Sequence, residues 1–77
     1  MKKRYKYIRF EYMKEGNVEF YRCYNIRHKC HLFDVEYDIK WKEWVTVEHQ
    51  GGLVMSVSCH KDTAHFLDQL NTPTTAK

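Results

Sequence analysis

"VEYDIKW", residues 35–41, is a stretch in which apolar and charged side chains alternate without interruption. The apolar positions are Val35, Tyr37, Ile39 and Trp41. Because successive side chains of a strand point to opposite faces of a sheet, this period of two predicts a strand with one buried and one solvated face. We therefore build the fold outward from a strand in the middle of the chain.

The residues before this stretch predict two further strands joined as a hairpin. Apolar residues recur at alternate positions in residues 5–13 and again in residues 18–26. Between them, residues 14–17 read KEGN, a turn sequence that contains a glycine. This turn places Phe10 opposite Phe20, so that both face the core.

The residues after residue 41 predict two more strands. Residues 45–49, VTVEH, alternate apolar and polar side chains, and residues 53–59, LVMSVSC, place Leu53, Met55, Val57 and Cys59 on one face. Residues 50–52, QGG, supply glycines for the turn between them. The count is then five consecutive strands, joined by short connections as an antiparallel meander.

The period changes near the C-terminus, where the sequence predicts a helix. Asp62 or Thr63 can cap its N-terminus, and Phe66, Leu67 and Leu70 form one apolar stripe. A helix of about ten residues is marginal alone, so it must pack on the sheet. The expected fold is α+β, an antiparallel meander of about five strands packed against one C-terminal helix. The sheet face under the helix is expected to hold Ile8, Phe10, Phe20, Val35, Ile39, Val47, Met55 and Val57.

A chain of 77 residues has room for one hydrophobic core. We expect a single domain over residues 1–71 and a flexible tail over residues 72–77, which read TPTTAK. The positively charged N-terminus is not followed by an apolar stretch, and no segment reaches the roughly twenty apolar residues of a membrane span. Three cysteines without a secreted-scaffold spacing favour free thiols in the cytoplasm.

The net charge is +3, and five of the thirteen basic residues lie in the first nine positions. A basic N-terminal segment attracts nucleic acid or an acidic protein, although a pI of 8.8 is modest for a dedicated nucleic-acid binder. A solvated sheet edge explains the same charges without a partner.

Cysteine and histidine are concentrated between Tyr21 and Phe33, where residues 28–31 read HKCH. Cys23, Cys59, His60 and His65 are further candidate ligands for zinc. The spacing matches no recognised zinc motif, and neighbours on a strand point to opposite faces. We therefore predict no metal site, with a zinc-stabilised domain as an alternative.

The sequence also predicts no catalytic residues and no cofactor. Cys30 near His28 and Cys59 near His60 are candidate nucleophile and base pairs, and neither is accompanied by a glycine-rich oxyanion turn. A glycine loop that would hold a phosphate is missing as well. We expect a protein that is not an enzyme.

The predicted pairing leaves one aromatic and basic surface without a covering element. Tyr5, Tyr7, Arg9 and Tyr21 fall on the face opposite the helix. Between the second and third strands, Arg27, His28 and Lys29 are expected to form an exposed basic bend. Tyrosine and arginine are enriched at protein interfaces, and they also stack on single-stranded bases. In a closed sheet, the same tyrosines would instead form a second small core.

These seven residues are the predicted partner-binding site of a non-catalytic binding protein. We expect the partner to be a larger protein or nucleoprotein complex, with nucleic acid as the alternative and no role for a membrane. A homodimer through an end strand is compatible with an open sheet. In its layout the chain resembles small phage and mobile-element inhibitors of host defence systems, including anti-CRISPR proteins, and this resemblance implies an inhibitor that blocks its partner.

Overall fold

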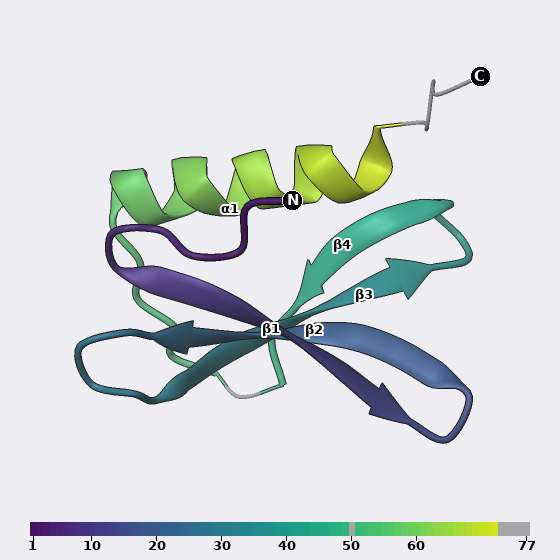
Figure 1. Ribbon diagram of the computed structural model, residues 1–77, viewed down its shortest axis with the longest axis horizontal. Helices are drawn as coiled ribbons and strands as arrows, with labels where there is room; N and C mark the ends of the chain where they lie inside the picture. The colour runs from purple at the N-terminus through teal and green to yellow at the C-terminus, as the bar shows by residue number, and fades with distance from the viewer. Residues whose placement is uncertain (50, 73–77) are drawn as a thin grey trace.

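The computed structural model describes residues 1–49 and 51–72. One helix lies along one side of an antiparallel sheet, as Figure 1 shows, so the predicted α+β class is confirmed. The sheet has four strands in the order β1-β2-β3-β4 and not five. The elements are β1 (Ile8–Glu15), β2 (Val18–Asn25), β3 (His31–Asp38), β4 (Glu43–Val47) and α1 (Val57–Asn71).

The first hairpin is tighter than predicted, and this changes its faces. Glu15 pairs directly with Val18, so Gly16 and Asn17 alone form the turn. Gly16 has a φ of 62°, as the first central residue of a type II′ turn requires. Phe10 consequently pairs with Cys23 and not with Phe20. The register differs by three residues, an odd number, so the predicted inward and outward faces of β2 are exchanged.

The second connection agrees with the prediction of a polar bend. Residues 26–30 connect β2 to β3, and the tip is closed by a bond from the Asn25 amide to the Cys30 carbonyl at 2.9 Å. The Asn25 side chain also accepts from the amide of His28 at 2.8 Å. The register between β2 and β3 shifts at Cys23 and Tyr24, which marks a β-bulge.

The strand predicted at residues 35–41 ends three residues early, at Asp38. The Asp38 carboxylate accepts bonds from the amides of Lys40 and Trp41 at 2.7 and 3.1 Å, which turns the chain. Ile39 and Trp41 are therefore highly exposed and not part of the core. The alternating pattern does not reveal that the Asp38 side chain, and not a neighbouring strand, bonds the backbone amides here.

The predicted strand at residues 53–59 is wrong, because α1 begins at Val57. Ser56 is its N-cap, and the Ser56 hydroxyl accepts from the amide of Cys59 at 3.2 Å. The buried residues of α1 are Cys59, Thr63 and Phe66, at helical spacing. The predicted turn at residues 50–52 includes Gln50, which lies outside the described residues.

The core lies between α1 and one face of the sheet. Ile8, Phe10 and Val35 are buried there as predicted, and Met55 packs against them while half-buried. Phe20 is buried and Val47 half-buried on the opposite face, which corrects their predicted position, and Val57 is exposed. The core residues are Tyr5, Ile8, Phe10, Cys23, Phe33, Val35, Cys59 and Phe66.

The sheet is open, since β1 and β4 each pair with one strand only among the described residues. The N-terminal segment runs beside α1 in Figure 1, and the Lys2 amide donates to Gln69 at 2.7 Å. Among the described residues, the helix α1 lacks the length and the apolar character needed to cross a membrane. Of the predicted tail, residues 73–77 lie outside the described residues, and Thr72 caps α1 through its amide.

Candidate functional site

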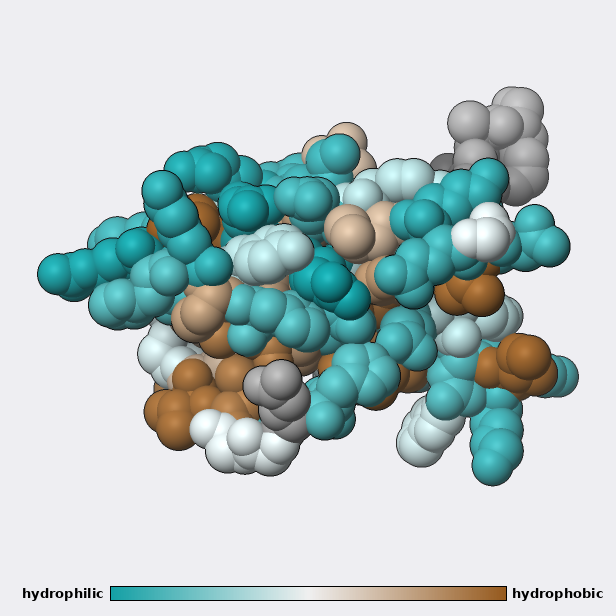
Figure 2. All heavy atoms as spheres, turned by 90° about the horizontal axis from the view of Figure 1, so that it is seen from below, coloured by the Kyte–Doolittle hydropathy of each residue, from teal (hydrophilic) through white to brown (hydrophobic). Residues whose placement is uncertain are grey.

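The face of the sheet that points away from α1, called here the outer face, carries most of the polar contacts between strands. Figure 2 views the molecule from the side opposite α1 and shows hydrophilic side chains over much of that surface. The pairing of the strands assigns to this face Arg9, Phe20, Arg22, Tyr24, Asp34, Glu36 and Val47. This register therefore brings charged residues of β1, β2 and β3 to one surface.

Asp34 is the centre of the outer face, and it is buried, with 3% of its surface exposed. The Asp34 carboxylate accepts through Oδ1 from Arg22 Nε at 3.1 Å and from His31 Nε2 at 2.8 Å. Arg22 lies opposite Asp34 in the ladder between β2 and β3. This bond to Asp34 raises the pKa of the Arg22 guanidinium, because the carboxylate stabilises its positive charge.

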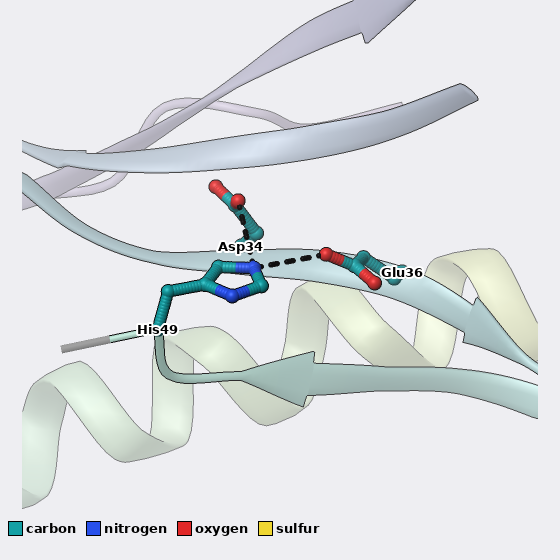
Figure 3. Close-up of side chains that lie close together, drawn as sticks. All are labelled: Asp34, Glu36 and His49. Atoms are coloured by element: carbon teal, nitrogen blue, oxygen red, sulfur yellow. Dashed lines mark hydrogen bonds and ion pairs between the residues drawn. The ribbon is translucent and has the colours of Figure 1, made fainter. Parts of the chain in front are cut away.

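The other oxygen of Asp34 faces His49, which follows the end of β4. His49 Nε2 lies 3.3 Å from Asp34 Oδ2 and 3.1 Å from Glu36 Oε2. Figure 3 shows the imidazole reaching back toward the two carboxylates on β3. Asp34 and Glu36 are two residues apart and so share one face of the strand. Two carboxylates and an imidazole nitrogen converge here, which is chemistry suited to binding a cation.

An aromatic and cationic row continues from Asp34 to β1. The Arg9 guanidinium lies over the Tyr24 ring at 4.5 Å and pairs with Glu11 at 3.1 Å. The Tyr24 ring in turn lies 6.0 Å from the ring of His31, which contacts Asp34. The row therefore crosses β1, β2 and β3 through side-chain contacts, and a planar cation on an aromatic face is a common element of binding surfaces.

At one end of the sheet, the hairpin tip and the segment before β1 form a second exposed surface, which carries several basic side chains. The Ile26 amide donates to the Tyr7 carbonyl at 2.9 Å, which holds the two segments together. A hollow of about 340 Å³ opens beside this bond, lined by Lys6, Tyr7, Asn25, Ile26, Arg27 and His28. Lys29 continues the exposed tip with a φ of 56°. We call Lys6, Tyr7, Arg27, His28 and Lys29 the basic tip.

The structure divides the predicted partner-binding residues between three places. Tyr7, Arg27, His28 and Lys29 are exposed at the basic tip, and Arg9 lies on the outer face. The predicted placement of Tyr5 and Tyr21 on the uncovered face is wrong, because the helix covers both.

Tyr5 is 8% exposed, and its hydroxyl contacts His65 Nδ1 of α1 at 2.8 Å. Tyr21 packs edge to face on Phe66 with ring centroids 5.1 Å apart. Burial raises the pKa of both phenols. The register error in the first hairpin explains the misplacement of Tyr21. Tyr5 precedes β1 in a segment that turns back toward the helix, so strand alternation does not apply to it.

The cysteines and histidines that suggested zinc are not gathered into one site among the described residues. Cys23 and Cys59 are buried in the core, whereas Cys30 is exposed at the hairpin tip. Burial, with a smaller contribution from neighbouring Cys59, raises the pKa of Cys23 to about 12, so this thiol is not a ready ligand at neutral pH. His65 is engaged by Tyr5.

The cluster of Asp34, Glu36 and His49 was missed at the level of sequence. The sequence indicates this cluster in one way only, because Asp34 and Glu36 are two residues apart and so lie on the same, polar side of β3. The approach of His49 depends on the register of β3 with β4, in which Asp34 pairs with Val47. Comparison with protein families, with curated proteins and with solved structures found no match to this chain.

Proposed function

We propose that this protein is a non-catalytic binding protein that contacts a larger protein or nucleoprotein partner in the cytoplasm through the basic tip. The observation that carries the proposal is the joining of Tyr7 to the hairpin bend, which surrounds one hollow with an exposed tyrosine and basic side chains. Among the described residues that line this hollow, none is acidic. An acidic surface on the partner is the matching chemistry.

The contact residues suit recognition because they are held in place before a partner arrives. The bond between Ile26 and Tyr7 and the Asn25 bonds within the bend fix the backbone on both sides of the hollow. Preorganised loops lose less conformational entropy on binding than free ones. On the outer face of β1, the Arg9 guanidinium stacks on Tyr24 and pairs with Glu11, so its position is fixed as well.

The specific form of this proposal is an inhibitor of a host defence complex, of the kind that phages encode against CRISPR systems. The support for this form is the small α+β layout combined with a preformed basic contact surface. A basic contact surface of this kind would bind an acidic patch on such a complex and block it there.

The test compares two double variants in quantitative capture from a host lysate. Tyr7→Ala with Arg27→Ala removes the central pair of the basic tip. Tyr37→Ala with Lys40→Ala removes an exposed tyrosine and a lysine at the opposite end of β3, and so serves as the matched control. The parent and the control should capture the same amount of partner, and the tip variant should capture at least tenfold less. The reason is that tyrosines and arginines dominate the binding energy of interfaces. Equal retention by all three proteins would contradict the proposal.

Nucleic acid is the second candidate for the same surface, favoured by the exposed Tyr7 ring among cationic side chains. Stacking of a base on tyrosine and contacts of lysine and arginine with phosphates are the expected interactions. Binding to generic single-stranded DNA or RNA would then weaken steeply as salt rises. Absence of binding at low salt would remove this candidate and leave the protein partner.

A further inference from the structure

We propose that Asp34, Glu36 and His49 form a binding site for a divalent transition-metal ion, with Zn²⁺ as the best match. Three protein ligands would hold the ion, and the fourth position would be open to water or to a donor atom of a partner. This site is independent of the basic tip, since it shares no residue with it. It also differs from the cysteine and histidine set that the sequence suggested.

Two of the three separations between the ligand atoms are close to those of a tetrahedral site. Bonds of about 2.0–2.1 Å from zinc to nitrogen and oxygen imply separations of roughly 3.3 Å between neighbouring ligand atoms of a tetrahedron. His49 Nε2 lies 3.3 Å from Asp34 Oδ2 and 3.1 Å from Glu36 Oε2. All three ligand atoms lie within 4.8 Å of one another. The side chains therefore need only small movements to enclose an ion.

The charges around His49 favour a cation between the Asp34 and Glu36 oxygens that face it, beside the positive charge that Arg22 already supplies at the other oxygen of Asp34. Two carboxylate oxygens approach the same ring nitrogen, which carries at most one proton to share between them. Neighbouring carboxylates repel one another unless positive charge lies between them. A divalent ion would contact both oxygens and the nitrogen lone pair simultaneously, which a single proton cannot do.

The residues around the cluster orient the central ligand. Arg22 and His31 both bind Oδ1 of Asp34, which leaves Oδ2 directed at His49. Such second contacts fix a ligand's direction and are typical of metal sites. The positive charge of Arg22 also offsets one carboxylate, so the affinity should be lower than that of an enclosed zinc site with thiolate ligands.

Access and ligand type both fit an exchangeable zinc ion. The side chain of Asp34 is 5% exposed, whereas those of His49 and Glu36 are 51% and 39% exposed, so one side of the cluster opens to solvent. An imidazole with two carboxylates suits zinc, while magnesium prefers oxygen ligands in an octahedron. The open side provides the fourth coordination position.

Calorimetric titration of the metal-free protein with zinc chloride tests the site. The background is Cys30→Ser, because Cys30 is an exposed thiol that binds zinc for unrelated reasons. We expect one zinc per chain. Both His49→Ala and Glu36→Gln should weaken binding at least tenfold, as loss of a ligand requires. His60→Ala is the matched control, since His60 is exposed on α1 and lies outside the cluster, and it should bind zinc like the background protein.

A second measurement does not depend on the folding of any variant. Zinc should shift the imidazole NMR signals of His49 and leave those of His60 unchanged, and cobalt bound in its place should show the visible bands of a tetrahedral centre. The proposal is overturned if zinc does not bind with one-to-one stoichiometry at millimolar concentration. It is also overturned if His49→Ala folds and binds zinc as tightly as the His60→Ala control.

Discussion

Phe10 of β1 and Phe66 of α1 stack face to face, with ring centroids 3.9 Å apart and planes inclined by 4°. Both side chains are buried, and the Tyr21 ring closes the stack with its edge on Phe66. Asn71 adds polar contacts at the end of the helix by bonding to the backbone amide and carbonyl of Trp44. The stack is thus the apolar centre through which the helix is attached to the sheet.

Replacing Phe66 by alanine should reduce the free energy of unfolding by about 3–5 kcal/mol, the usual cost of removing a fully buried phenylalanine. For a domain of this size, such a loss removes much of the total stability. Urea denaturation followed by circular dichroism measures it. Val57→Ala is the control on the same helix, because Val57 is exposed and should cost no more than about 0.5 kcal/mol. Similar losses in both variants would contradict the assigned core.

The start of α1 at Val57 predicts a capping role for Ser56. Ser56→Ala should destabilise the protein by about 1 kcal/mol, because the amide of Cys59 loses its acceptor. Ser56→Asn should keep most of the stability, since asparagine caps helices as well as serine does. Thermal unfolding of the three proteins checks this. If Ser56→Ala and Ser56→Asn melt at the same temperature, the cap is not where the structure places it.

Alkaline pH should destabilise the fold through Cys23. Burial raises the pKa of this thiol from its ordinary value of 9.0 to about 12. Between these values the unfolded chain releases the proton while the folded chain keeps it, so the free energy of unfolding falls as pH rises. The contribution is at most about 1.4 kcal/mol per pH unit. Tyr5 and Tyr21, whose pKa values are also raised by burial, act in the same direction above their ordinary value of 10.0.

Urea denaturation at a series of pH values above about 9 measures this slope. Cys23→Ala should flatten it, whereas Cys30→Ala should leave it unchanged because Cys30 is exposed. Identical slopes in the two variants would exclude Cys23 as the source.

The three cysteines should differ in their reaction with a thiol reagent under native conditions. Cys30 is exposed and should react rapidly, while Cys23 and Cys59, 0% and 9% exposed, should react only when the chain opens. One fast equivalent per chain is expected, and Cys30→Ser should abolish it. Two or more fast equivalents in the folded protein would show that the core cysteines are accessible.

Much of the sheet could be predicted because apolar residues recur at every second position within its strands. The helix was predicted in part, since Phe66, Leu67 and Leu70 lie at helical spacing. Its first turn and the residues before it were mistaken for one strand, because Leu53, Met55, Val57 and Cys59 occupy alternate positions, as the buried residues of a strand would. The serine cap at Ser56 and the burial of Cys59 decide that segment in favour of the helix.

Sequence alone determined the fold class, the first three strands and the exposed basic bend, because alternation and turn chemistry are local properties. Tertiary structure decided which face each residue occupies. A two-residue turn at Gly16 and Asn17 moved Tyr21 under the helix, and the pairing of β3 with β4 brought His49 to Asp34 and Glu36. Register is set by turn length and by packing on the helix, so a displacement of an odd number of residues exchanges the two faces while the pattern of the sequence stays the same.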